Sequence, residues 1–182
     1  TIIYVTHDQT EALTMSTKIA IFCEGIIIQV AHPLELYNNP ANLYVADFIG
    51  NPRINFVDGK AEVSASGLTV NSGLGRMTFP ADHLKDENMP QEASFDAVLG
   101  IRPEFLDIAD KSSLEGEIYG AMPTGMESTI KVRVGGFLLT GVIFGSSLFT
   151  IGSEVPLSVT GDQIMLFDRK SGRCITSGSL TF

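Results

Sequence analysis

The chain is poor in cysteine and histidine, and both shortages limit what it can bind. Its 182 residues include two cysteines and three histidines. Two cysteines are too few for a disulfide framework, and Cys23 and Cys174 have no C-x-x-C spacing for zinc. His7, His32 and His83 also lack metal-ligand spacing. We therefore expect no metal site.

Basic residues are scarce as well. Lys and Arg number 12 against 21 Asp and Glu, which gives a formal net charge of −9. A protein that binds DNA or RNA needs a basic surface to displace counterions from the phosphates. We therefore expect no nucleic-acid partner. The acidic segment 82–92 and His83 within it are interpreted as solvated surface.

The sequence has no good membrane span. Residues 134–153 carry no charge, but half of them are Gly, Ser or Thr, and five glycines divide them into strand-length pieces. A spanning helix needs about 20 mainly apolar residues, so we expect no direct membrane insertion. There is also no N-x-Ser/Thr sequon and no signal-like start, which favours a cytoplasmic chain.

What the chain does contain is the composition of a folded protein, with 44% hydrophobic and 18% charged residues. Residues 1–6 form an apolar, β-branched run typical of a buried parallel strand. One such strand cannot exist alone. We therefore expect the chain to be a piece of a longer protein.

Local signals predict short helices and a hairpin over the next 45 residues. Asp8 and Glu11 have the spacing of a capping box, which predicts a helix to Met15. Residues 18–23 and 26–30 read as two strands joined by a turn at Glu24 and Gly25, and Pro33 starts a short helix. Residues 42–49 read as another helix, which ends at the domain boundary Gly50-Asn-Pro52.

Beyond this boundary the pattern changes to that of a small all-β barrel or sandwich. Turn signals recur about every 8–12 residues. They lie at 58–59, 66–67, 71–73, 116, 125, 135–136, 145, 161–162 and 171–172. Between them lie strand-like segments at 68–70, 95–101, 116–119, 129–134, 155–159 and 163–167.

His7 is the strongest candidate for chemistry. It lies where the first predicted strand ends and a capped helix begins, and in open α/β sheets ligands bind at this end of the strands. Its imidazole could contact a phosphate oxygen or an attacking water. A histidine that merely fills a strand-to-helix corner is the alternative.

Several ordered segments resemble the ATP-binding subunits of ABC importers, in particular the maltose and sugar importer branch. Val5-Thr-His-Asp-Gln-Thr-Glu-Ala12 resembles the switch-histidine region, and Phe48-Ile-Gly-Asn-Pro-Arg-Ile-Asn-Phe56 is similar to the hinge of that branch. Leu99-Gly-Ile-Arg-Pro-Glu-Phe-Leu106 is similar to its regulatory-domain signature. Further similar segments are Lys18-Ile-Ala-Ile-Phe-Cys-Glu-Gly25, Pro33-Leu-Glu-Leu-Tyr37, Leu114-Glu-Gly-Glu-Ile118 and Met165-Leu-Phe-Asp168.

This resemblance implies a mainly β fold with a short α/β remnant. Residues 1–50 would be the tail of a nucleotide-binding domain, and residues 51–182 an OB-like barrel known as the transport-associated regulatory domain. His7 would be the switch histidine, which contacts the γ-phosphate of ATP and positions the water. Asp8 and Glu11 are assigned to helix capping.

The resemblance also implies partners and a cellular place. Subunits of this family act as homodimers on the permease subunits, at the inner face of the plasma membrane, and use ATP and Mg²⁺ to drive solute uptake. The solute would be a sugar or a sugar-like compound. The barrel would regulate the subunit and contribute to dimerisation.

The chain should not hydrolyse ATP alone, because the sequence lacks the elements that hold the phosphates. It contains neither the G-x-x-x-x-G-K-[ST] pattern of a P-loop nor the Ser-Gly-Gly of an ABC signature. Ile164-Met-Leu-Phe-Asp168 imitates a Walker B strand, but Arg169 follows where a catalytic Glu is needed. We interpret it as an ordinary barrel strand.

Two other functions remain open. The chain could be a stand-alone OB-like barrel that binds a small anion or metabolite. It could also be a complete small hydrolase that uses His7, although no nucleophile-elbow motif or acidic partner at a suitable spacing accompanies it.

Overall fold

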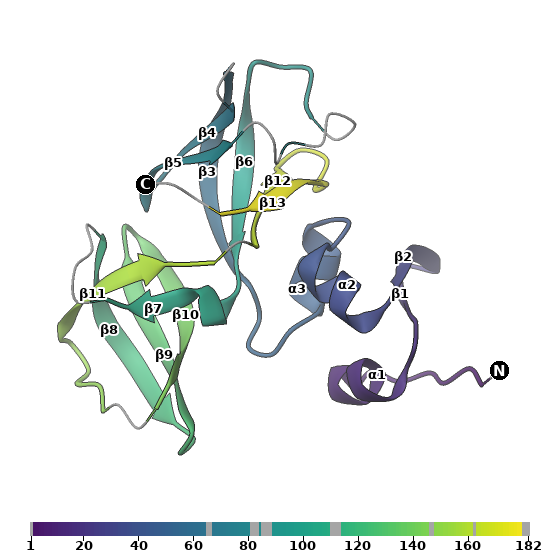
Figure 1. Cartoon of the computed structure of the whole chain (residues 1–182), viewed down its shortest axis with the longest axis horizontal. Helices are drawn as coiled ribbons and strands as arrows, with labels where there is room; N and C mark the ends of the chain where they lie inside the picture. Colours follow the sequence, from purple (N-terminus) through teal and green to yellow (C-terminus); the bar gives the residue numbers. More distant parts are fainter. Residues whose placement is uncertain are drawn as a thin grey trace.

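The computed structural model describes residues 2–64, 67–80, 84, 89–109, 114–145, 148–161 and 163–179. The chain begins with an N-terminal part of short helices and a hairpin, and the remaining strands form two larger sheets (Figure 1). The six-stranded sheet takes strands from both before and after those of the five-stranded sheet. The predicted mainly β fold with a short α/β remnant is confirmed. Outside the described residues lie positions 1, 66 and 162 of the segments discussed above, His83, and part of the acidic segment 82–92.

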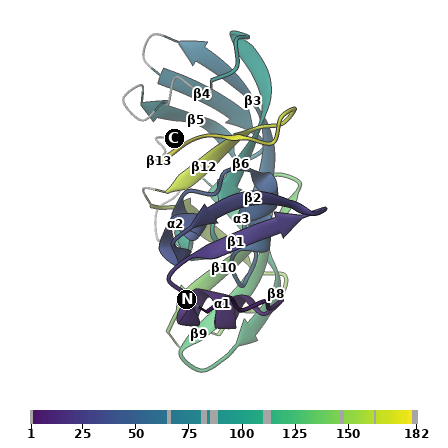
Figure 2. The same ribbon diagram turned by 90° about the vertical axis from the view of Figure 1, so that its right-hand side faces the viewer.

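The N-terminal part has the elements that its local signals predict. They are α1 (Gln9–Met15), β1 (Ile19–Cys23), β2 (Ile26–Ala31), α2 (Pro33–Asn38) and α3 (Leu43–Phe48). Asp8 caps α1 by accepting hydrogen bonds from the Thr10 and Glu11 amides, and Asn42 caps α3 through the Val45 amide. Glu24 and Gly25 both have positive φ, as a tight hairpin turn requires. In Figure 2 these elements face the viewer.

Residues 2–6 differ from their prediction. Residues 2–6 form no helix or strand, and the side chains of Ile2 and Val5 are 93% and 90% exposed. A strand is stabilised by hydrogen bonds to a neighbouring strand and by packing on its faces. None of the described strands pairs with this segment, so its apolar, β-branched pattern alone does not produce a strand.

The region after Gly50 is all β, as its turn rhythm predicts, and its strands form two sheets. The six-stranded sheet has the order β13-β12-β6-β3-β4-β5, and the five-stranded sheet has the order β10-β9-β8-β11-β7. All the strand pairs within them are antiparallel. The six-stranded sheet comprises β3 (Asn55–Ser64), β4 (Gly67–Ser72), β5 (Gly75–Pro80), β6 (Ser94–Ile101), β12 (Ile164–Asp168) and β13 (Cys174–Gly178). The five-stranded sheet comprises β7 (Leu106–Ile108), β8 (Leu114–Pro123), β9 (Glu127–Val134), β10 (Phe137–Phe144) and β11 (Glu154–Val159).

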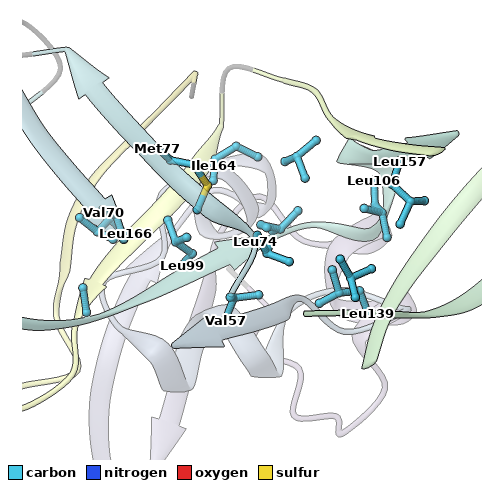
Figure 3. Close-up of a cluster of buried hydrophobic side chains, with 14 of the residues drawn as sticks. Val57, Val70, Leu74, Met77, Leu99, Leu106, Leu139, Leu157, Ile164 and Leu166 are labelled. Carbon is cyan, nitrogen blue, oxygen red and sulfur yellow. The ribbon is translucent and has the colours of Figure 1, made fainter. Parts of the chain in front are cut away.

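One continuous hydrophobic core joins the two sheets. Val57 and Leu99 come from the six-stranded sheet, Leu139 and Leu157 from the five-stranded sheet, and all four belong to the same cluster (Figure 3). The short 3-10 helix η3 (Pro103–Phe105) connects β6 to β7 and so leads the chain from one sheet to the other. The two sheets are therefore held together by shared apolar burial.

Two predicted turn positions lie inside strands instead. Gly59 is within β3 and Gly116 is within β8. A Cβ on Gly116 would lie 2.5 Å from Val132 Cγ1 and 2.7 Å from Leu157 Cδ1. This glycine therefore leaves room for packed side chains, and does not mark a turn.

The uncharged residues 134–153 include strand β10. This strand spans Phe137–Phe144. Within the described ranges we find no helix with the length and apolar character needed to cross a bilayer.

Candidate functional site

His7 lies on an exposed corner directly before α1. Its neighbour Asp8 is the N-cap, with the Asp8 Oδ1 atom 2.7 Å from the Thr10 amide nitrogen. The imidazole is exposed, and among the described residues none forms a hydrogen bond or ion pair with it. The side chain is therefore accessible, and the cap fixes the backbone on its C-terminal side.

Glu11 organises the segment before α1. The Thr6 hydroxyl donates to Glu11 Oε2 at 2.7 Å, and the Tyr4 hydroxyl donates to the same oxygen at 3.2 Å. The hydrogen bond with Glu11 raises the pKa of Tyr4. Thr6 Oγ1 in turn accepts from the Asp8 amide at 3.0 Å. In the predicted capping box the Glu11 side chain would accept directly from the Asp8 amide. In the structure the Thr6 hydroxyl lies between Glu11 and that amide.

The Gln9 side chain of α1 binds the backbone at Gly50, where the N-terminal part ends. Gln9 Oε1 accepts a hydrogen bond from the Gly50 amide at 2.9 Å. Gln9 is the first residue of α1, two positions after His7. The His7 corner is therefore attached to the Gly50 boundary.

Arg102 is the most completely buried charged group among the described residues. Its side chain has no solvent exposure. Its Nη1 donates to the carbonyl oxygens of Ala46 (3.1 Å) and Ile49, and its Nη2 donates to the carbonyl oxygen of Tyr37 (2.9 Å). These carbonyls lie in the last turns of α2 and α3 or directly after them, where the helix dipole favours a cation.

An aromatic ring, itself hydrogen-bonded to a carboxylate, also lies against Arg102. The guanidinium lies 4.0 Å from the centre of the Tyr37 ring, and the Tyr37 hydroxyl donates to Glu104 Oε1 at 2.6 Å. Burial lowers the pKa of Arg102, while the charges of Tyr37 and Glu104 act to raise it. Burial and the hydrogen bond to Glu104 raise the pKa of Tyr37 well above its ordinary value.

Sequence reasoning gave Arg102, Gln9 and Gly50 no individual role. Arg102 appeared only inside a segment that resembles a family, and Gly50 only inside another such segment and at the domain boundary. The available signal was a single basic residue directly after the apolar end of β6. That signal does not say which carbonyls the arginine meets, because its three acceptors lie 53 to 65 residues away in sequence.

The Walker-B-like segment is a strand, as interpreted. It forms β12, between β13 and β6 in the six-stranded sheet. Asp168 accepts hydrogen bonds from the Ser171 hydroxyl and amide and from the Lys170 amide. Partial burial alone would raise the pKa of Asp168, but these hydrogen bonds hold it below its ordinary value. Its carboxylate therefore stabilises the turn after β12.

A cavity of about 360 Å³ lies between the N-terminal part and β13. Its lining residues are Gln29, Asn39, Pro40, Ala41, Arg173, Cys174, Ile175, Thr176 and Ser177. The Gln29 amide group is already engaged, because it donates to the Asn39 carbonyl and accepts from the Ala41 amide. Arg173 is the lining residue that carries a charge. Within the described chain no group of three or more His, Cys, Asp or Glu residues could hold a metal.

The chain is similar to curated ATP-binding proteins of ABC transporters. An uncharacterized ABC transporter ATP-binding protein of Bacillus subtilis, YurJ, is 34% identical over 181 residues, which cover 96% of this chain and 49% of that protein. The xylose/arabinose import ATP-binding protein XacJ of Haloferax volcanii is 33% identical, covering 96% and 47%. The trehalose/maltose import ATP-binding protein MalK of Thermococcus litoralis is 34% identical, covering 96% and 48%.

The chain therefore spans about half the length of the curated relatives it matches. No family model matches it. Among solved structures, the molybdate-bound form of the cytoplasmic molybdate-binding protein ModG aligns with a TM-score of 0.49 and 12% identity, over 62% of this chain and 94% of that one.

Proposed function

Because the chain belongs to the family of ABC transporter ATP-binding proteins, we propose that it is the C-terminal half of the ATP-binding subunit of an importer. The solute would be a sugar or a sugar-like compound, which two relatives named as importers of xylose/arabinose and of trehalose/maltose support. Residues 1–50 would end the nucleotide-binding domain, and residues 51–182 would form the regulatory region. The whole subunit would couple ATP hydrolysis to uptake by docking on permease subunits at the cytoplasmic face of the membrane.

The accessible imidazole of His7 carries this proposal. It stands at a corner fixed by the Asp8 cap and by the Glu11 hydrogen bonds, and the described residues leave it without a partner. In the whole subunit His7 would contact the γ-phosphate of ATP and orient the attacking water. The half that precedes this chain would supply the P-loop and the groups that hold Mg²⁺, because this sequence contains no P-loop.

The test is made in the full-length subunit with its permease. We expect His7→Ala to lower ATP turnover by about 10²-fold or more, the range for loss of a group that moves or orients a proton, and to leave ATP binding in place. His32→Ala is the matched control, since His32 is also exposed and precedes a helix but makes no side-chain cap. Unchanged turnover in His7→Ala would refute the assigned role.

The regulatory region is also proposed to contribute to a homodimer. One end of the five-stranded sheet exposes large apolar side chains: Met126 is 87% exposed and Phe144 is 74% exposed. They are neighbours, because Phe144 pairs with Glu127 and the Gly145 amide donates to the Met126 carbonyl. Light scattering of the full-length subunit should give the mass of a dimer, and Phe144→Glu should lower that mass. A strict monomer at high concentration would contradict dimerisation.

A second candidate function is binding of a small anion. The 360 Å³ cavity with Arg173 at its wall favours it, since ligand pockets begin at about 300 Å³. Inorganic phosphate and sulfate would be tested by thermal shift, with Arg173→Met as the comparison. An anion-dependent rise in Tm that Arg173→Met removes would support this function, and no shift would exclude these two anions.

A further inference from the structure

One peptide group connects the β region to the His7 corner. The carbonyl of Ile49 accepts from Arg102 Nη1, and the amide of the same peptide unit, the N–H of Gly50, donates to Gln9 Oε1 at 2.9 Å. A peptide unit is planar and rigid. A hydrogen bond on its oxygen also polarises its N–H, so the two interactions strengthen each other. Arg102 and Gln9 are therefore coupled through a single rigid group.

Arg102 suits this position because of its shape. Its planar guanidinium presents several donors in a fixed fork, and two of its nitrogens reach three carbonyls from α2 and α3. A lysine ammonium is a compact charge without that fork. Arg102 also lies directly between β6 and η3, so its position is set by the β region. If this part of the β region moved, Arg102 Nη1 would move relative to the Ile49 carbonyl that it binds.

We propose that Arg102 is a positioning residue for His7. It orients the Ile49–Gly50 peptide, which holds Gln9 and so the first turn of α1, with His7 directly before the Asp8 cap. This inference rests on the proposed role of His7 for its effect on hydrolysis. The connection itself does not, because it consists of contacts within this chain.

The first test measures amide hydrogen exchange in the full-length subunit. In Arg102→Lys we expect the amides of Gly50 and of the first turn of α1 to exchange about tenfold faster or more, because hydrogen bonds to a charged group are lost. Strands β8 and β9 should keep their protection. Arg133→Lys is the matched control, since Arg133 also lies over a tyrosine ring, but at the surface, where it pairs with Glu117. Unchanged exchange at Gly50 and α1 in Arg102→Lys would overturn the proposal.

A second pair of variants avoids the buried charge, in case Arg102→Lys fails to fold. Gln9→Met removes the acceptor for the Gly50 amide, whereas Gln9→Glu keeps one. We expect Gln9→Met to speed exchange at Gly50 and α1 as Arg102→Lys does, and Gln9→Glu to restore the slow rate. Equal exchange in the three Gln9 forms would also overturn the proposal.

The second test separates positioning from general loss of stability. We expect Gln9→Met to lower kcat for ATP about tenfold, because a small misplacement of a reacting group is costly, with the KM for ATP unchanged and kcat recovered in Gln9→Glu. If His7→Ala abolishes turnover but Gln9→Met leaves kcat intact, the positioning role is wrong. If His7→Ala itself leaves turnover intact, the proposed function fails, and the exchange result still decides whether Arg102 holds α1.

Discussion

Gly50 is subject to two constraints at the scale of a single residue. Its φ is +122°, a value that residues with a Cβ rarely adopt. A Cβ there would also lie 2.9 Å from Arg102 Nη1 and 3.3 Å from the Tyr37 ring. Backbone conformation and close approach therefore both require glycine at the point where the N-terminal part meets the β region.

We expect Gly50→Ala to lower the free energy of unfolding by more than backbone strain alone would. Gly125 offers the comparison, because its φ is +104° but a Cβ there would meet nothing within 4 Å. Strain should cost each variant about 1–3 kcal/mol, and displacement of the guanidinium should cost Gly50→Ala about 1–3 kcal/mol more. Urea unfolding measures both free energies; equal losses would show that Arg102 accommodates the methyl group.

The contacts of Arg102 and Gln9 could not be predicted from the sequence, for a physical reason. Local signals such as the Asp8 cap act within three residues, and the structure has that cap. The contacts of Arg102 and Gln9 join residues 41 to 65 positions apart. Only the folded chain brings such residues together. The roles assigned to His7 and to the domain division stay predictions.

At the scale of elements, the turn between β12 and β13 depends on one carboxylate. Asp168 accepts from Ser171 and Lys170, and its backbone also bonds Arg173 and Gly172. The pKa of Asp168 is lowered in the folded state. Its stabilisation is therefore present above the unfolded value of about 4 and is lost as the pH falls through the lower, folded-state pKa.

We expect Asp168→Asn to lower Tm at pH 7 by a few degrees at most, because solvent screens this carboxylate. The difference from the wild-type chain should shrink below about pH 4 as the wild-type carboxylate is protonated. Glu115→Gln, at an exposed position in β8, controls for the change in net charge. A Tm difference that stays constant from pH 7 to pH 2 would contradict this role.

Elements that carry their own start and stop signals were predictable. Pro33 begins α2, Asn42 caps α3, and Glu24 with Gly25 turns the β1–β2 hairpin. Residues 2–6 were predicted wrongly because a strand needs a neighbour, and none of the described strands lies beside them. The pattern left a barrel and a sandwich both open, since alternation within a strand does not say which strand it pairs with.

At the scale of the whole molecule, a buried amide links the two sheets. Asn55 lies in β3, and its Nδ2 donates to the Ile101 carbonyl (3.1 Å) and to the Thr140 carbonyl (2.8 Å). Its Oδ1 accepts from the Thr140 amide at 2.7 Å. Thr140 lies in β10, the edge strand of the five-stranded sheet. The Asn55 side chain therefore satisfies backbone groups of that edge as a neighbouring strand would.

We expect Asn55→Ala to destabilise the chain by about 2–4 kcal/mol, because it leaves a buried carbonyl of Ile101 and part-buried backbone groups of Thr140 without the Asn55 side chain as partner. Asn55→Asp should be similarly harmful: it keeps the acceptor for the Thr140 amide but turns a carboxylate toward two carbonyl oxygens. Asn71→Ala, at an exposed position in β4, should change the unfolding free energy by about 0.5 kcal/mol or less. Urea unfolding compares the three variants. If Asn55→Ala were as stable as Asn71→Ala, the shared hydrophobic core alone would hold the two sheets together.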